Sequence, residues 1–181
     1  ADEGYRVVLW QTDGAVVVDR AVDPNSVAEV LGEGSVYALF AHQIEAEIPD
    51  PTLRAAIETA LGTEHVTITG MRALKRLEVV DANVFDLTGL EHATNLTYLD
   101  LTGNDIMDIS ALSSLKRLTA LGLAYNRIDD VTALAGMEDL EQLALFGNRI
   151  SDIGPLQSLT KLQAVNLNDN RVKDIDVMAQ W

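Results

Sequence analysis

Residues 96–117, LTYLDLTGNDIMDISALSSLKR, decide the fold, because their pattern of apolar residues returns every 22 positions along the second half of the chain. Copies of the pattern begin at Leu74, Leu118, Leu140 and Leu162, with no insertion or deletion between them. A fixed period of this length predicts a solenoid, in which each copy forms one coil and buries its apolar residues against the neighbouring coils.

Each apolar position of the repeat keeps its character in all the copies. The apolar columns start at Leu74, Leu77, Val79, Val84, Leu87 and Leu90 and continue at intervals of 22 residues. One polar column lies among them and holds Asn104, Asn126, Asn148 and Asn170, with Ala82 in the first copy. Because a buried amide must be hydrogen-bonded, we expect these asparagines to bind backbone groups of the adjacent turn.

The LxxLxLxxNxIxDIxxL pattern resembles the leucine-rich repeat, specifically the 22-residue class of internalin-like bacterial surface proteins. The resemblance implies an α/β fold, a right-handed solenoid with a parallel β-sheet on its concave face. A coiled coil is excluded because it needs a heptad period, and an amphipathic helix is excluded because it would not carry the alternating LxL. The resemblance also implies that the protein binds other proteins and is not an enzyme.

Three segments are predicted: a β-rich extension over 1–47, an N-terminal cap and junction over 48–73, and five repeats over 74–181. Residues 48–62 read IPDPTLRAAIETALG, in which Asp50 is placed to cap a helix, Pro51 to begin it and Gly62 to end it. The segment resembles the capping helix that precedes the repeats in bacterial extracellular leucine-rich proteins. We therefore expect this helix to shield the first coil from water.

Residues 1–47 show no sign of the repeat. Apolar and β-branched runs predict strands from Tyr5 to Trp10, from Ala15 to Val22 and from Ser35 to Ala41, with Asp13-Gly14 in a hairpin turn. Asp23 and Pro24 are typical of an N-cap and a first helical residue, so a short helix is expected from Pro24 to Leu31.

The composition limits the kinds of partner. The net charge of −15 disfavours nucleic acid and anionic membranes, because both repel an acidic surface. The absence of cysteine excludes disulfides, thiolate metal sites and a cysteine nucleophile. No apolar run reaches the roughly 20 residues that span a bilayer, so no membrane insertion is expected. The chain begins Ala-Asp-Glu-Gly, which suits a product of signal-peptide removal and predicts a secreted or cell-surface protein.

The outward positions of the expected strands form a candidate binding face. By analogy with the family, a protein ligand would lie there, with Tyr98, Tyr125 and Phe146 as aromatic anchors around a hollow of alanine and glycine. In the alternative interpretation, the small residues merely pack on a curved sheet and the aromatic residues are incidental. The candidate residues are Arg76, Glu78, Tyr98, Asp100, Thr102, Gly122, Ala124, Tyr125, Gln142, Ala144, Phe146, Asn166 and Asn168.

The fifth repeat is expected to present an apolar face without a C-terminal cap. The N-terminal strands of a second copy could pair with its edge, which would join copies head to tail. The candidate assembly residues are Leu162, Val165, Leu167, Val172, Ile175, Met178 and Trp181 in the repeat, and Tyr5, Val7, Leu9 and Trp10 in the strands.

An aspartate column allows two interpretations; it holds Asp86, Asp108, Asp130, Asp152 and Asp174. The carboxylates could bind calcium, or each could accept backbone N–H groups in its own turn, with Arg127, Arg149 and Arg171 nearby to relieve their repulsion. We favour the structural role and expect no metal and no cofactor. His42, His65 and His92 are scattered and no catalytic motif occurs, so an enzyme is not expected.

These observations give three functional hypotheses in order of preference. The first is an extracellular protein that associates with copies of itself into a filament or surface assembly. The second is a monomeric adhesin or receptor-binding module that uses the concave face. The third is a regulatory scaffold subunit, because related 22-residue repeats also occur in phosphatase regulators.

Overall fold

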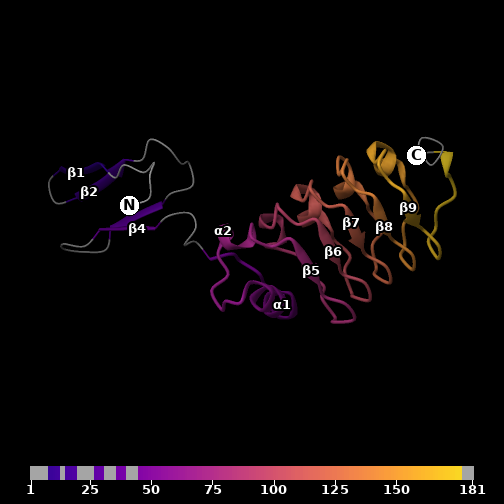
Figure 1. The fold of residues 1–181 in the computed structure, drawn as a ribbon, viewed down its shortest axis with the longest axis horizontal. Helices are drawn as coiled ribbons and strands as arrows, with labels where there is room; N and C mark the ends of the chain where they lie inside the picture. Colours follow the sequence, from indigo (N-terminus) through magenta and orange to yellow (C-terminus); the bar gives the residue numbers. More distant parts are fainter. Residues whose placement is uncertain (1–7, 13–14, 20–26, 31–35, 40–44, 177–181) are drawn as a thin grey trace.

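The computed structural model describes residues 8–12, 15–19, 27–30, 36–39 and 45–176. Residues 45–176 form the expected solenoid (Figure 1). We refer to its coils as coils one to five, which begin at Leu74, Leu96, Leu118, Leu140 and Leu162.

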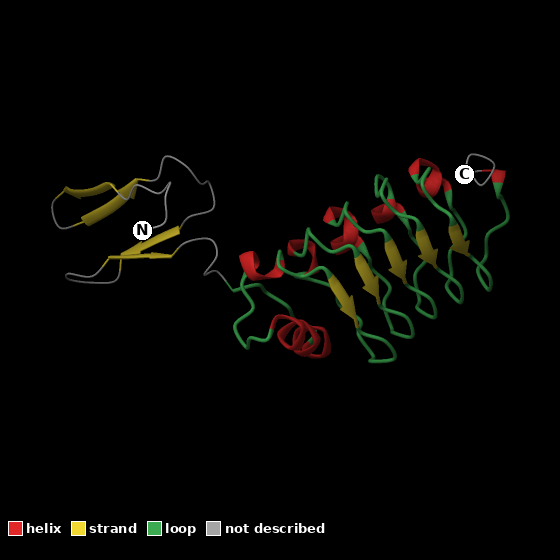
Figure 2. Ribbon diagram, in the orientation of Figure 1, coloured by secondary structure: helices red, strands yellow, loops and turns green. Residues whose placement is uncertain are grey.

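Each coil contributes one short strand to a parallel sheet with the order β5-β6-β7-β8-β9. The strands are β5 (Arg76–Glu78), β6 (Tyr98–Asp100), β7 (Ala120–Gly122), β8 (Gln142–Ala144) and β9 (Ala164–Asn166). Each strand residue of β5–β8 pairs with the residue 22 positions later, as Leu77 does with Leu99, so the repeat period is also the register of the sheet. Figure 2 shows the strands in a row, with the helical turns of the return segments along one edge.

After its strand, each of coils one to four returns through a longer segment that contains only a short helical turn. They contain the 3-10 helices η2 (Leu90–His92), η3 (Ser110–Ser114), η4 (Thr132–Leu134) and η5 (Gly154–Ser158). The middle residue of each strand and the apolar residues of each return point inward, and all six apolar columns are buried in coils one to four. Burial of these columns is the main source of stability in such a fold.

The asparagine column binds the backbone of two coils at once, as expected. The Asn126 amide nitrogen donates to the carbonyls of Leu101 (3.0 Å), Leu123 (3.1 Å) and Ala124 (3.1 Å). Its amide oxygen accepts from the Ile106 N–H at 3.1 Å. Asn104, Asn148 and Asn170 make corresponding bonds. Each asparagine therefore ties its own turn to the coil before it.

The predicted capping helix is confirmed as α1 (Pro51–Leu61), followed by the single turn α2 (Ile68–Met71). Leu53 and Ile57 lie on its inner face and are fully buried in the core of the solenoid. The helix ends at Gly62, whose φ of 66° allows its N–H to bond to the last carbonyls. The cap therefore covers the apolar side of coil one.

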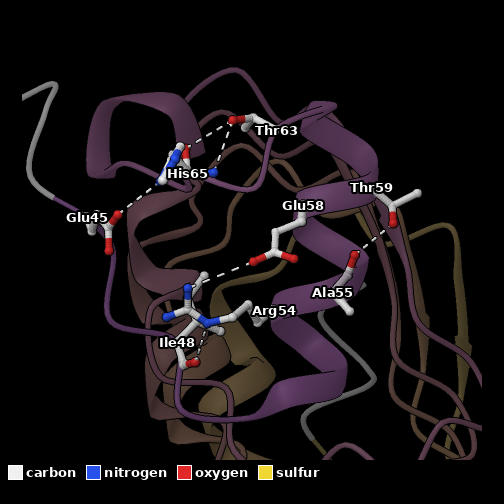
Figure 3. Close-up of polar contacts among 8 residues, drawn as sticks. All are labelled: Glu45, Ile48, Arg54, Ala55, Glu58, Thr59, Thr63 and His65. Atoms are coloured by element: carbon white, nitrogen blue, oxygen red, sulfur yellow. Dashed lines mark hydrogen bonds and ion pairs between the residues drawn. The ribbon is translucent and has the colours of Figure 1, made fainter.

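The outer face of the cap carries polar contacts, as Figure 3 shows. Arg54 donates to the Ile48 carbonyl at 3.3 Å and lies 3.9 Å from the Glu58 carboxylate. In the loop after the helix, Nδ1 of His65 lies 3.3 Å from the carboxylate of Glu45, which precedes the helix. This face is compatible with water, which is what the end of a solenoid requires.

Asp50 joins the cap to coil one. One carboxylate oxygen accepts from the N–H groups of Thr52 (2.9 Å) and Leu53 (3.0 Å), which caps α1. The other accepts from the N–H groups of Phe85 (3.0 Å) and Asp86 (3.5 Å) in coil one. Asp50 is only 1% exposed, so these N–H groups replace the water that a carboxylate otherwise needs.

The strands before the cap form two antiparallel hairpins. β1 (Val8–Thr12) pairs with β2 (Ala15–Asp19), and β3 (Val27–Val30) pairs with β4 (Val36–Leu39). Tyr5, Val7 and the Asp13-Gly14 turn lie outside the described residues.

Two predictions in this region are wrong. Residues 27–30 are a strand and not part of a helix, because a helix of eight residues offers few hydrogen bonds against its nucleation penalty, whereas Val27 and Val30 pair with Leu39 and Val36. The predicted boundary after residue 47 also shifts. The Ala46 N–H bonds to the Val66 carbonyl at 2.8 Å and Ala46 is buried, so residues 45–47 pack with the cap.

Replacing Asn126 by Ala should destabilise the fold, because the buried Ile106 N–H loses its acceptor, while the Leu101 carbonyl keeps the bond from Asn104. We expect a loss of about 2–3 kcal/mol in the free energy of unfolding, measured in urea. Asn170→Ala is the matched control, because Asn170 makes corresponding bonds but is only half-buried, and it should lose about 1 kcal/mol. Equal losses in the two variants would contradict a role that depends on burial.

Candidate functional site

The outward residues of β5–β9 form one continuous face, here called the concave face. The burial of each strand alternates, with the middle residue inside and its neighbours outside. The parallel register arranges the outward residues in rows that run across the coils. The first row is Arg76, Tyr98, Ala120, Gln142 and Ala164; the second is Glu78, Asp100, Gly122, Ala144 and Asn166. Thr102, Ala124, Phe146 and Asn168 follow just beyond the strands.

Coils one and two place a cation on an aromatic ring. The Arg76 guanidinium carbon lies 3.5 Å from the centre of the Tyr98 ring, and the same guanidinium contacts the Glu78 carboxylate. Stacking on the ring and pairing with the carboxylate together fix the orientation of Arg76. This end of the concave face is therefore charged but locally neutralised.

Tyr125 and Phe146 form the second aromatic group. Their rings meet edge to face, with centres 4.6 Å apart and planes at 78°. The Tyr125 backbone is in the left-handed region at a φ of 52°, although Tyr125 is 59% exposed. This conformation costs a bulky residue about 1–2 kcal/mol, so the ring is presented to solvent at the expense of stability.

Each coil has a turn after its strand, and the position that Tyr125 occupies in the turn of coil three is held by glycine in coils two and four. The five positions are Asp81, Gly103, Tyr125, Gly147 and Asp169, and all have φ between 51° and 72°. A Cβ on Gly147 would lie 2.6 Å from Cδ1 of Tyr125, so the Tyr125 ring covers Gly147. A Cβ on Gly103 would likewise lie 1.9 Å from Oδ1 of Asp81. The glycines therefore provide space for the side chain of the preceding coil.

Coil three carries small residues between these two groups. Gly122 has no side chain, and a Cβ there would lie 2.5 Å from Oδ1 of Asp100, so the Asp100 carboxylate lies over Gly122. Asp100 also accepts the Thr102 N–H at 3.0 Å, which fixes its position. Ala124 is buried and offers no surface for contact, so its place among the candidate binding residues is wrong.

The aspartate column has the turn-stabilising contacts that the sequence favours. Asp86, Asp108, Asp130, Asp152 and Asp174 each accept the N–H two residues ahead at 2.8–2.9 Å. The Thr88 and Thr132 hydroxyls also donate to Asp86 and Asp130, and these bonds lower the pKa of both carboxyls. Among the described residues, no group of three or more histidine, aspartate or glutamate side chains is arranged to hold a metal ion.

Arg127, Arg149 and Arg171 were expected to lie near the aspartate column and relieve its repulsion. Arg127 pairs with Asp105 at 2.8 Å, in a different column from the five aspartates. The expectation that these arginines relieve repulsion in the aspartate column is therefore wrong for Arg127. The turn contacts satisfy the aspartates locally, which leaves Arg127 free to pair with the coil before it.

Coil five buries its apolar residues less than the other coils do. Leu162, Val165, Leu167 and Val172 are half-buried, and Ile175 is 61% exposed. Leu9 and Trp10 lie in β1, while Met178 and Trp181 lie beyond the part of the chain that the structure describes. None of the helices in the described part is long and apolar enough to cross a bilayer.

Residues 48–170 match a family model described as the leucine-rich repeat domain of the endo-beta-N-acetylglucosaminidase EndoS. This chain belongs to the leucine-rich repeat family. Members of this family are generally protein-interaction modules without enzymatic activity. No curated protein matches the chain.

Solved structures of internalins resemble this leucine-rich repeat protein. It is 31% identical to internalin InlF from Listeria monocytogenes, with a TM-score of 0.62 over 74% of the chain. It is 30% identical to internalin C2 from the same organism, with a TM-score of 0.57 over 73% of the chain. It is 26% identical to InlJ, also from Listeria monocytogenes, with a TM-score of 0.66 over 73% of the chain. The chain spans 47% of the InlF chain, 70% of internalin C2 and 29% of InlJ.

Replacing Tyr125 by Gly should leave the fold intact. Relief of the left-handed backbone offsets the loss of the contact with Phe146, so the free energy of unfolding should change by no more than about 1 kcal/mol. Leu121→Ala in the same coil removes a buried side chain and should cost about 2–5 kcal/mol. A loss for Tyr125→Gly as large as that for Leu121→Ala, in thermal or urea unfolding, would make Tyr125 a structural residue.

Proposed function

We propose that this leucine-rich repeat protein is a secreted or cell-surface module that binds another protein through its concave face. The observation that carries the proposal is Tyr125, an exposed aromatic residue in an unfavourable backbone conformation beside Phe146. Residues kept in such conformations are common at binding sites, where function outweighs stability. Exposed aromatic residues are also the side chains that most often dominate the energy of an interface.

The dimensions of the face limit the shape of the partner. Five strands at about 4.8 Å give a sheet roughly 24 Å long, and its area is near 300 Å² against about 800 Å² for each side of a standard interface. The partner must therefore also contact the turns that follow the strands, in which Asp81, Tyr125 and Asp169 lie. A protruding loop fits this description better than a flat surface.

A photo-crosslinking experiment tests the concave face. Benzoylphenylalanine replaces Gln142, which is exposed on the face, or Met107, which is exposed outside the sheet and serves as the control. Each variant is irradiated with a preparation of surface proteins, and the crosslinked protein is identified by mass spectrometry. We expect a specific product at position 142 that is lost on adding Tyr125→Gly, which retains the fold. Products at position 107 alone, or equal products at both positions, would contradict the proposal.

Self-association is the second candidate, and the half-buried apolar residues of coil five favour it. In this candidate, the β1–β2 hairpin of another copy, whose β1 holds Leu9 and Trp10, pairs with β9 and covers these residues. Such a contact joins unlike surfaces and would extend into a filament unless it closes a ring.

Sedimentation over a wide concentration range tests this second candidate. We expect the mass to rise above the 19.6 kDa of one chain, and Val172→Glu should abolish the rise by placing a charge in the apolar face. Ser151→Glu adds the same charge at an exposed position of coil four and should leave the association unchanged. A mass that stays at 19.6 kDa at every concentration would exclude self-association.

A further inference from the structure

We propose that a group of cations in the loops after the strands of coils four and five binds an acidic segment of the protein partner. This group, here called the edge cation cluster, consists of Arg149, Arg171 and Lys173. The inference rests on the proposed function and specifies the chemistry of the part of the partner that reaches past the concave face.

The loop after each strand places one residue of every coil in a common row. The N–H groups of Arg127, Arg149 and Arg171 each bond to the carbonyl of the isoleucine 21 residues earlier, at 2.8–2.9 Å. Such bonds hold neighbouring chains about 4.8 Å apart, so the three arginines follow one another from coil to coil. All three are exposed, while the residues on either side of each are buried or half-buried, so their side chains point away from the core. Figure 2 shows these loops beneath the arrowheads of the strands, on the opposite side from the helical turns.

The first arginine of the row shows how this position engages a carboxylate. Asp105 holds the same position in coil two, and its carboxylate lies 2.8 Å from the Arg127 guanidinium. Both side chains are about half exposed, so the pair forms at the surface without the help of burial. A carboxylate placed one coil away is therefore within reach of an arginine in this row.

Arg149 and Arg171 lack such a neighbour. The residue one coil before each of them is another arginine, and within residues 45–176 neither forms an ion pair. Lys173 lies two residues after Arg171, is exposed, and also has no ion pair in that part of the chain. Like charges on neighbouring chains repel each other, so a carboxylate from outside would both pair with these cations and relieve their repulsion.

The charge of the chain is distributed unevenly, and the cluster lies in its least acidic part. Residues 140–181 hold four basic and five acidic side chains, whereas residues 1–139 hold nine basic and 23 acidic side chains. An acidic segment therefore meets little repulsion at coils four and five, although the whole chain carries a net charge of −15.

Three aspartates beside the cluster limit the length of the segment. Asp152 and Asp174 each accept a backbone N–H through one carboxylate oxygen, and Asp169 lies in the turn before Arg171. Two or three acidic side chains can pair with the cations at close range, where their attraction is least screened by salt. A long polyanion would also run along the acidic remainder of the chain and be repelled there. The charges thus favour a short segment of a protein over a sulfated polysaccharide.

The cluster lies next to the turns that a partner on the concave face must contact. Tyr125 precedes Arg127 by two residues, and Asp169 precedes Arg171 by the same interval. A loop that is anchored at Tyr125 and passes over these turns meets the row of arginines next. Acidic residues in that part of the loop would therefore add to the contacts made on the concave face.

Titration with short peptides tests the cluster directly. The probe is acetyl-Gly-Glu-Glu-Glu-Gly-amide, and its control carries glutamine in place of each glutamate, which keeps the shape without the charge. We expect saturable NMR shifts of the Nε–H signals of Arg149 and Arg171 at millimolar glutamate peptide, and binding about fivefold weaker for the glutamine peptide. Equal affinity for the two peptides, or tighter binding of a heparin tetrasaccharide than of the glutamate peptide, would overturn the inference.

Matched variants locate the anion. Arg149→Gln and Arg171→Gln should each weaken binding of the glutamate peptide about threefold. Arg72→Gln removes the same charge from an exposed arginine that has no ion pair within residues 45–176 and precedes coil one, so it should leave the affinity unchanged. A loss for Arg72→Gln as large as that for the two cluster variants would show that only net charge matters and would contradict the proposed site.

Freeing Arg127 should extend the row by one cation. Asp105→Asn removes the carboxylate that pairs with Arg127, so the glutamate peptide should bind about two- to threefold more tightly. Asp139→Asn is the control, because it removes the same charge and frees Lys161, which precedes β9 instead of following it. The control should bind the peptide as the unmodified protein does, and equal gains in the two variants would overturn the inference.

The failure of this inference is distinguishable from failure of the proposed function. If the protein crosslinked at position 142 binds a variant with both Arg149→Gln and Arg171→Gln as tightly as the unmodified chain, the concave face remains the binding site and the cluster is not part of it. If no protein crosslinks there but the glutamate peptide binds as expected, the concave face is wrong and the cluster stands. If the peptide also causes no shifts, both are wrong.

Discussion

The stacking of coils depends on the side-chain amides of the asparagine column. A parallel sheet leaves the turn after each strand with buried N–H and C=O groups that water cannot reach. Asn126 satisfies such groups in coils two and three together, and the same position in coils two, four and five does so for the neighbouring turns. Hydrophobic burial supplies most of the free energy and strand pairing sets the register, while the amides hold each turn against the turn of the preceding coil.

This arrangement leaves the outward positions free to vary. The buried columns and the asparagines determine the fold, so residues such as Arg76, Tyr98 and Phe146 can be chosen for contact without disturbing the core. Tyr125 goes further, because its backbone conformation opposes stability and its ring lies over the space that Gly147 provides. At this turn position, a residue with a side chain is followed one coil later by a glycine, which leaves room for that side chain.

The sequence predicts the solenoid and much of the concave face, because the period of 22 determines both which residues are buried and which ones share a row. It also predicts the role of Asp50 in capping α1, but not its second pair of bonds, to backbone N–H groups of coil one, which depend on where the cap packs. The alternation of Asp81, Gly103, Tyr125 and Gly147 is present in the sequence as a 22-residue spacing, yet only the backbone angles show its meaning. The helix expected over 24–31 fails because strand pairing with β4 outweighs a weak local preference.

The bonds of Asp50 make the cap end of the solenoid difficult to open. Local opening there must break four hydrogen bonds to one buried carboxylate and expose Leu53 and Ile57. Two of these bonds go to backbone N–H groups of coil one, so α1 cannot separate from the solenoid without loosening that coil as well. The backbone amides where α1 meets coil one should therefore exchange their hydrogens slowly, together with those of the core.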